Sequence, residues 1–316
     1  MTDISLAASW TRIFIAICTL IGSAEYLAIR SQFTGPGIFS DTIHLLQWTR
    51  GPRFLVTLYR IAYSHQIVMS GQIVRIVLAL LLIAPLDMRT YSLVLLVLFA
   101  IQLQIYTQAG VGNDGSDQML FVVTPSLAVA YGFSLNGPCA WIPLWFIVAQ
   151  AVLAYETSGI SKLVSPVWRS GRAIELIFNT AGYGSQKVSK LLARSPALAL
   201  IGAWTVIIFE CVFPFVLIAP KQIMILMLVV AVVFHVGCAL TMGLNCFLWA
   251  FASTYSLLYL FNADRASALS GLTGAHNDKM ALAIGSLVSF AIVAIIVIRY
   301  YELLPHFRVK VFSSQD

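Results

Sequence analysis

The segment YETSGISKLVSPVWRSG, residues 155–171, lies where a long apolar run gives way to a basic, amphipathic stretch. It predicts that a helix leaves the lipid here and places Lys162 at the boundary between hydrocarbon and water. Trp168 supports this placement, because tryptophan rings prefer the headgroup level of a bilayer. A partly desolvated lysine at this depth can act as a proton acceptor. The alternative is a lysine that reaches for the headgroups and only marks the end of a helix.

The composition is that of a polytopic membrane protein. Hydrophobic residues make up 59% of the 316 residues and charged residues 10%, and the mean hydropathy is +0.88. A soluble domain has about 25% charged residues. The net charge of +6 is spread over loops and helix ends, which favours contact with anionic lipid headgroups over nucleic acid. The five cysteines show no paired metal-ligand spacing and are interpreted as small buried residues.

Apolar runs that are long enough to cross a bilayer recur along the chain. They predict an all-α transmembrane bundle of about nine spans, forming a single domain over residues 1–316. The expected spans are 11–29, 65–85, 91–108, 118–134, 138–160, a span that starts at 196, 222–242, 246–261 and 280–298. Two amphipathic connections, about 31–63 and 162–195, are expected to lie in the interface plane, because cations alternate there with apolar side chains. The distribution of cations between loops predicts that the Lys162 face is cytoplasmic.

Three ionisable residues are expected within the membrane: Glu25, Arg75 and Glu210. Such groups are costly in lipid unless they are paired inside the bundle, so each is a candidate functional residue. One interpretation is an Arg–Glu bridge that fixes helix register, and the other is a path for a substrate or a proton. Pro214 follows Glu210 by one turn and is expected to kink the helix beside the acid.

Two further motifs have a structural and a functional interpretation. Residues 110–115 match G-x-G-x-x-G, but they join two membrane helices and no βαβ unit surrounds them. Asp114, Ser116 and Asp117 are therefore interpreted as caps of the following helix, since calcium binding would need the spacing of an EF-hand. His235 and Cys238 share a helix face, where a metal or haem would need more ligands. A hydrogen-bonded core histidine is the alternative.

Several of these residues together resemble the HTTM (horizontally transferred transmembrane) family, which includes the membrane domain of vitamin K-dependent γ-carboxylase. The segment from Gly159 to Lys162, with Trp168 beyond it, is similar to the lysine motif of that family. Phe234-His235, followed by Met242-Gly243 and Phe247-Leu248-Trp249, resembles its later helix pair, and Arg12 and Glu210 are similar to further family positions. The resemblance to the carboxylase implies a lipid quinone of the vitamin K type as cofactor. Lys162 would then be the base, and His235 or Glu210 would orient the ring.

In length and in its Asn-Asp-Gly-Ser-Asp-Gln loop, the chain is most similar to the SdpB-type (sporulation-delaying protein B) branch of the family. This resemblance implies a multi-pass protein of the bacterial cytoplasmic (inner) membrane. Such a protein would act with a partner maturation protein on a secreted, antimicrobial or toxin-like peptide precursor. Lys162, Glu210 and His235 would shape a polar cavity, with further lining from Arg75, Glu25, Trp168, Asp114 and Asp117. A quinone-dependent, carboxylase-like enzyme and a purely structural bundle remain the alternatives.

Overall fold

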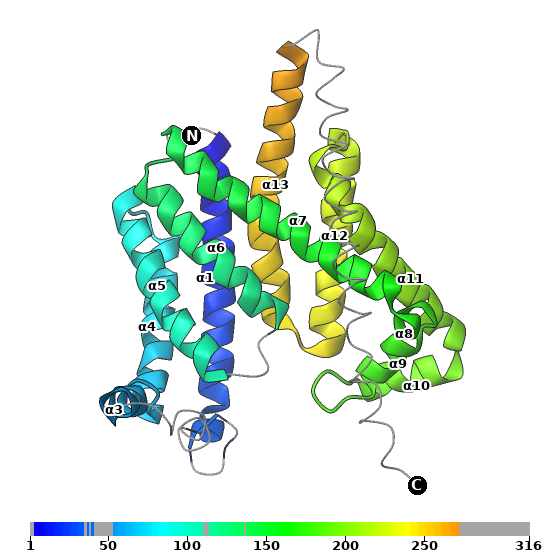
Figure 1. Ribbon diagram of the computed structural model, residues 1–316, viewed down its shortest axis with the longest axis horizontal. Coiled ribbons are helices and arrows are strands. Elements are labelled where there is room, and N and C mark those ends of the chain that lie inside the picture. Colours follow the sequence, from blue (N-terminus) through cyan, green and yellow to red (C-terminus); the bar gives the residue numbers. More distant parts are fainter. Residues whose placement is uncertain are drawn as a thin grey trace. The chain divides into compact units, whose positions relative to one another are not determined.

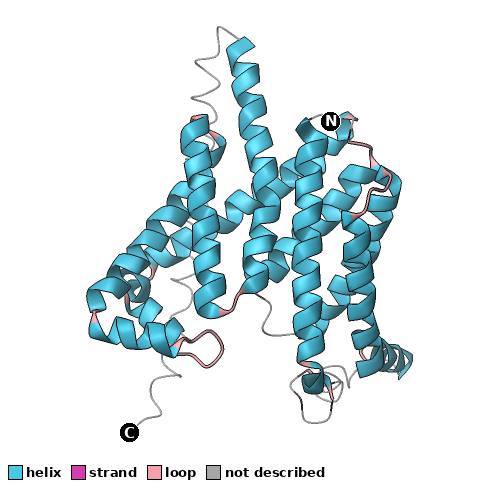
Figure 2. Ribbon diagram, turned by 180° about the vertical axis from the view of Figure 1, so that it is seen from behind, coloured by secondary structure: helices cyan, strands magenta, loops and turns pink. Residues whose placement is uncertain are grey.

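A computed structural model describes residues 3–34, 37, 39–40, 53–109, 114–135 and 137–271. Most of these residues are helical and none of them forms a strand, which confirms the all-α prediction (Figures 1 and 2). They divide into two compact units. Unit 1 comprises Met1–Gln150 with Leu244–Leu260, and unit 2 comprises Ala151–Gly243 with Phe261–Asp316. The longer helices are α1 (Asp3–Ala28), α4 (His65–Ile83), α5 (Met88–Ala109), α6 (Gly115–Gly132), α7 (Trp141–Val164), α11 (Pro196–Val212), α12 (Lys221–Met242) and α13 (Asn245–Gly271).

Six segments of the described chain are long and apolar enough to cross a bilayer, so the protein is a multi-pass membrane protein. They are Asp3–Ala28, His65–Ile83, Met88–Gln108, Pro138–Val164, Pro196–Leu217 and Lys221–Met242. The expected spans 118–134 and 246–261 also form helices, α6 and α13, but neither is among the six. Their polar residues, such as Asp117 in α6 and Ser253 in α13, lower the hydropathy of these segments. The expected span 280–298 lies outside the described residues.

Unit 1 contains two closely packed helix pairs, α1 with α4 and α5 with α6. Contacts between α4 and α5 connect the two pairs. Leu82, Leu95 and Leu127 are fully buried between them. Ala8 and Ala79 are also fully buried, and small residues of this kind let membrane helices approach closely. This packing brings polar residues of four helices together inside the unit.

Unit 2 contains a close approach between α7 and α11. A Cβ added at Gly159 would lie 2.7 Å from the backbone nitrogen of Cys211, so only glycine fits there. Helix α11 ends at Val212 and continues as a 3-10 helix, η3 (Phe213–Leu217), which contains Pro214. The helix type therefore changes at Pro214, one turn after Glu210, while the kink expected there stays a prediction. The side-chain amide of Asn262 donates to the carbonyl oxygens of Val216 (2.9 Å) and Ala219 (3.0 Å), which follow the change.

Amphipathic helices occupy both connections that were expected to lie in the interface plane. Helix α3 (Arg53–Ala62) exposes Phe54, Leu58 and Ile61, which share one face at helical spacing. Helix α10 (Gln186–Arg194) combines an exposed Leu191 with three cations in nine residues. Exposed apolar side chains beside cations are typical of helices that lie in the headgroup region.

Candidate functional site

The first cluster of predicted site residues is an ion pair within unit 2. The amine of Lys162, near the end of α7, donates to both carboxylate oxygens of Glu210 on α11, at 2.9 Å (Oε1) and 2.7 Å (Oε2). It also donates to the hydroxyl of Ser158, one turn earlier on α7, and that hydroxyl donates to Glu210 Oε1 at 3.2 Å. The Lys162 side chain is 16% exposed and the Glu210 side chain 5%. The two charges therefore neutralise each other inside the helices.

Trp168 completes the surroundings of the amine. It lies on α8 (Pro166–Arg169), and its ring centroid is 5.1 Å from Lys162 Nζ, within the range of a cation–π contact. The three N–H groups of an ammonium thus have three oxygen acceptors and an aromatic ring beside them. This geometry suits a charged lysine that holds α7 against α11.

His235 is a buried, hydrogen-bonded histidine, as the structural interpretation predicted. Its Nε2 shares a hydrogen bond of 2.6 Å with the hydroxyl of Tyr155, and the histidine is fully buried on α12. The Tyr155 ring packs on Phe213 with 3.8 Å between ring centroids. Sequence reasoning missed the roles of Tyr155 and Ser158. Their spacing of seven and four residues before Lys162, which places all three on one helix face, was an available signal.

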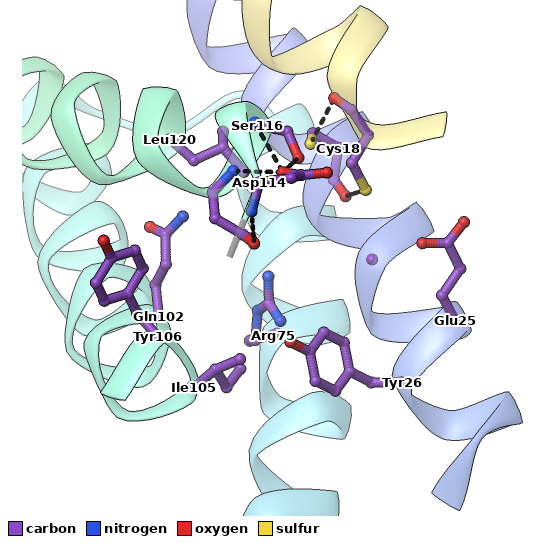
Figure 3. A pocket seen from close by; sticks show the side chains of 13 residues that line it. Cys18, Glu25, Tyr26, Arg75, Gln102, Ile105, Tyr106, Asp114, Ser116 and Leu120 are labelled. Atoms are coloured by element: carbon purple, nitrogen blue, oxygen red, sulfur yellow. Dashed lines mark hydrogen bonds between the residues drawn. The ribbon is translucent and has the colours of Figure 1, made fainter. Parts of the chain in front are cut away.

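The second cluster surrounds a pocket of about 130 Å³ inside unit 1 (Figure 3). Four of the predicted residues line it: Glu25, Arg75, Asp114 and Asp117. Residues that sequence reasoning did not single out complete the wall, including Tyr26, Ile105 and Tyr106. The predicted site residues therefore divide into two clusters, one in each unit.

Arg75 carries the positive charge of this pocket and is 6% exposed. Its Nη1 donates to Gln72 Oε1 at 2.9 Å, one turn earlier on α4, whereas its buried Nε–H has no hydrogen-bond partner. The Arg–Glu bridge considered from the sequence is wrong for this arginine, since Glu210 pairs with Lys162 and Glu25 accepts from Asn245 Nδ2 at 2.8 Å. Figure 3 shows the guanidinium reaching into the pocket toward the Asp114 end.

The opposite wall of the pocket is the start of α6. Asp114 Oδ1 accepts from the backbone N–H of Ser116 (2.8 Å) and Asp117 (3.1 Å), while Asp117 Oδ2 accepts from the backbone N–H of Asp114 (3.3 Å). This reciprocal capping box confirms the interpretation of these residues as helix caps. Burial, and secondarily the charge of Asp114, raises the pKa of Asp117 to about 6.

The cysteines and histidines of the described residues do not cluster with acids into a group of three or more metal ligands. Cys18 is buried as expected and donates to the carbonyl oxygen of Cys246 at 3.4 Å, whereas Cys139 is exposed. Comparisons of the chain with protein-family models, with curated proteins and with solved structures found no match. The chemistry of the two clusters is therefore the basis for assigning a function.

Proposed function

We propose that this chain is an HTTM-like, all-α protein with about nine spans in the bacterial cytoplasmic membrane. In this proposal it takes part in the maturation or export of a secreted, antimicrobial or toxin-like peptide, together with a partner maturation protein. The motif around Lys162 and the Phe234-His235 pair support the family assignment. The polar pocket at Arg75 supports a function that requires a polar ligand within membrane helices.

The buried Nε–H group of Arg75, which lacks an acceptor, is the observation that carries this proposal. A buried N–H without an acceptor is costly, and the cost is larger for a charged group. Asp114 and Asp117 stand on the other wall of the same pocket, so it presents donors on one side and acceptors on the other. A peptide end or turn offers the complementary carbonyl, carboxylate, amide and ammonium groups. A pocket of about 130 Å³ suits one such element and not a whole folded domain.

The alternative, a quinone-dependent enzyme with Lys162 as base, fits this geometry poorly. A general base must direct its lone pair at the proton that it removes. The Lys162 amine instead faces the two carboxylate oxygens of Glu210 and the hydroxyl of Ser158. This arrangement uses the amine as a hydrogen-bond donor, so we derive no reaction step through a quinone.

The proposal is tested by mass spectrometry of the peptides that the native host secretes, compared between the wild-type strain and a strain from which the gene for this chain is deleted. We expect at least one mature peptide to disappear on deletion and to return when the wild-type chain is supplied. Arg75→Gln should restore it poorly, whereas Arg89→Gln, which changes an exposed arginine at the start of α5, should restore it fully. Membrane levels of each variant are measured by immunoblot. An unchanged set of secreted peptides after deletion would contradict the proposal.

A further inference from the structure

Unit 1 contains a second, larger cavity, with a volume of about 380 Å³. It lies where α4 ends, α5 begins and α6 ends, beside the first turns of α1. Ile83, Leu86 and Leu135 contribute to an apolar wall, and the polar lining includes Ser9, Arg12 and Tyr131. The ends of helices that cross a bilayer lie near the level where lipid headgroups meet acyl chains, so we expect the cavity at that level.

Among the described residues that line this cavity, Arg12 is the one with a charge, and it is 7% exposed. Its guanidinium carbon lies 3.9 Å from the centroid of the Tyr91 ring, which supplies part of the compensation for the buried charge. Its Nε and Nη1 are buried, and neither has a hydrogen-bond partner. Besides a side-chain hydrogen bond with Tyr131, the guanidinium thus keeps two buried donors that an anion in the cavity would satisfy.

Asp87, which follows the lining residue Leu86 in the sequence, does not neutralise Arg12. Asp87 lies on the exposed turn between α4 and α5 and does not line the cavity. Its Oδ1 accepts from the backbone N–H groups of Arg89 and Thr90, both at 3.0 Å, and its Oδ2 accepts from the Thr90 hydroxyl at 2.5 Å. Its carboxylate is thus engaged in capping α5, which leaves the charge of Arg12 without an acidic partner among the described residues.

Tyr91 also holds the rim of the cavity in place. Its hydroxyl donates to the carbonyl oxygen of Ala84 at 2.7 Å and accepts from the backbone N–H of Leu86 at 3.0 Å. The same side chain therefore fixes the turn after α4 and presents its ring face to Arg12. These contacts fix the position of the guanidinium relative to the apolar wall without a bound ligand.

We propose that this cavity binds the anionic, phosphate-type headgroup of a membrane amphiphile. The guanidinium of Arg12 pairs with the headgroup oxygens through its unused N–H groups, and the apolar wall holds the first carbons of the chain. The site is separate from the Arg75 pocket and has a different chemical preference, since carboxylates line the Arg75 pocket and no described carboxylate lines this cavity.

Native mass spectrometry of the full chain in a nonionic detergent tests this proposal with three probes. Dodecyl phosphate carries the anion and the chain, dodecylphosphocholine carries the same chain without net charge, and inorganic phosphate carries the anion alone. We expect dodecyl phosphate to bind at least about tenfold more tightly than either of the others, the effect of one charge-assisted contact. Equal binding of dodecylphosphocholine would overturn the role of the charge. Equal binding of inorganic phosphate would overturn the role of the apolar wall.

Two substitutions at Arg12 and one control complete the test. Arg12→Gln should weaken dodecyl phosphate binding at least about tenfold. Arg12→Lys should keep only part of the affinity, because an ammonium retains the charge without the forked N–H groups, and Arg89→Gln should leave the affinity unchanged. Wild-type affinity in Arg12→Gln would refute the assignment. The comparison of probes on the wild-type chain decides the question even if Arg12→Gln fails to fold.

Discussion

Removing one charge of the Lys162–Glu210 pair should destabilise unit 2 far more than removing both. The pair has N–O distances of 2.7 and 2.9 Å, and its side chains are 16% and 5% exposed, so neither charge has bulk water as a substitute partner. Breaking a buried pair from one side costs about 3–5 kcal/mol, because an uncompensated charge remains. We therefore expect Lys162→Met to lower the free energy of unfolding by about 3 kcal/mol or more.

The double variant Lys162→Met/Glu210→Gln isolates the electrostatic part of this effect. It leaves no buried charge, and replacing a buried pair by uncharged groups of similar size is often close to neutral. We expect the double variant to be more stable than Lys162→Met by at least about 2 kcal/mol. The sum of the single effects should therefore exceed the effect of the double variant.

Unfolding in mixed micelles, titrated with sodium dodecyl sulfate and followed by far-UV circular dichroism, measures these differences. Lys187→Met on the exposed face of α10 is the matched control and should change stability by less than about 0.5 kcal/mol. A loss below about 1 kcal/mol in Lys162→Met, or additive effects in the double variant, would refute the view that the pair is a buried, mutually neutralising unit.

Three further predictions concern packing, capping and pH. Gly159→Ala should lower the free energy of unfolding by about 1–3 kcal/mol in the same assay, because the new Cβ would lie 2.7 Å from the backbone nitrogen of Cys211. Gly237→Ala is the control and should be neutral or stabilising, because a Cβ at Gly237 would have no atom within 4 Å. Asp114→Ala should cost about 1 kcal/mol through loss of the α6 cap, and an unchanged unfolding midpoint would argue against that role. The pKa of Asp117 rises from 3.8 to about 6 on folding, so the folded state binds the carboxyl proton more tightly than the unfolded state does. The free energy of unfolding should therefore fall by about 2–3 kcal/mol between pH 4 and pH 6 and change little at higher pH. Asp117→Asn should remove that slope, and the same slope in the variant would contradict the assignment.

The sequence predicted the helical elements well because long apolar runs permit few other structures in lipid. The cap at Asp114 and the change of helix type at Pro214 were also predictable, since both depend on neighbours within one turn. Glu156, which is 3% exposed, could have been found by the reasoning that selected Glu25 and Glu210. An acid inside an apolar run was the signal in all three cases.

The partners of the buried charges were not predictable from the chain alone. Lys162 and Glu210 are 48 residues apart, and their contact depends on the close approach that Gly159 permits between two helices. Arg75 donates a hydrogen bond to the side-chain amide of Gln72 on its own helix instead of pairing with a glutamate on another helix. Each outcome is set by helix rotation and register, which a single sequence with no visible repeat does not specify.

The amide of Asn262 has a consequence for where the loop between α11 and α12 can reside. Proline and 3-10 geometry release carbonyl oxygens that an ordinary helix would satisfy itself, and water would normally be needed to hydrate them. Two of these oxygens, on Val216 and Ala219, are already occupied by a donor from α13. This reversal of chain direction can therefore stay submerged below the phospholipid surface, and a hydrophilic collision agent such as a nickel chelate should reach it less readily than a typical exposed hairpin.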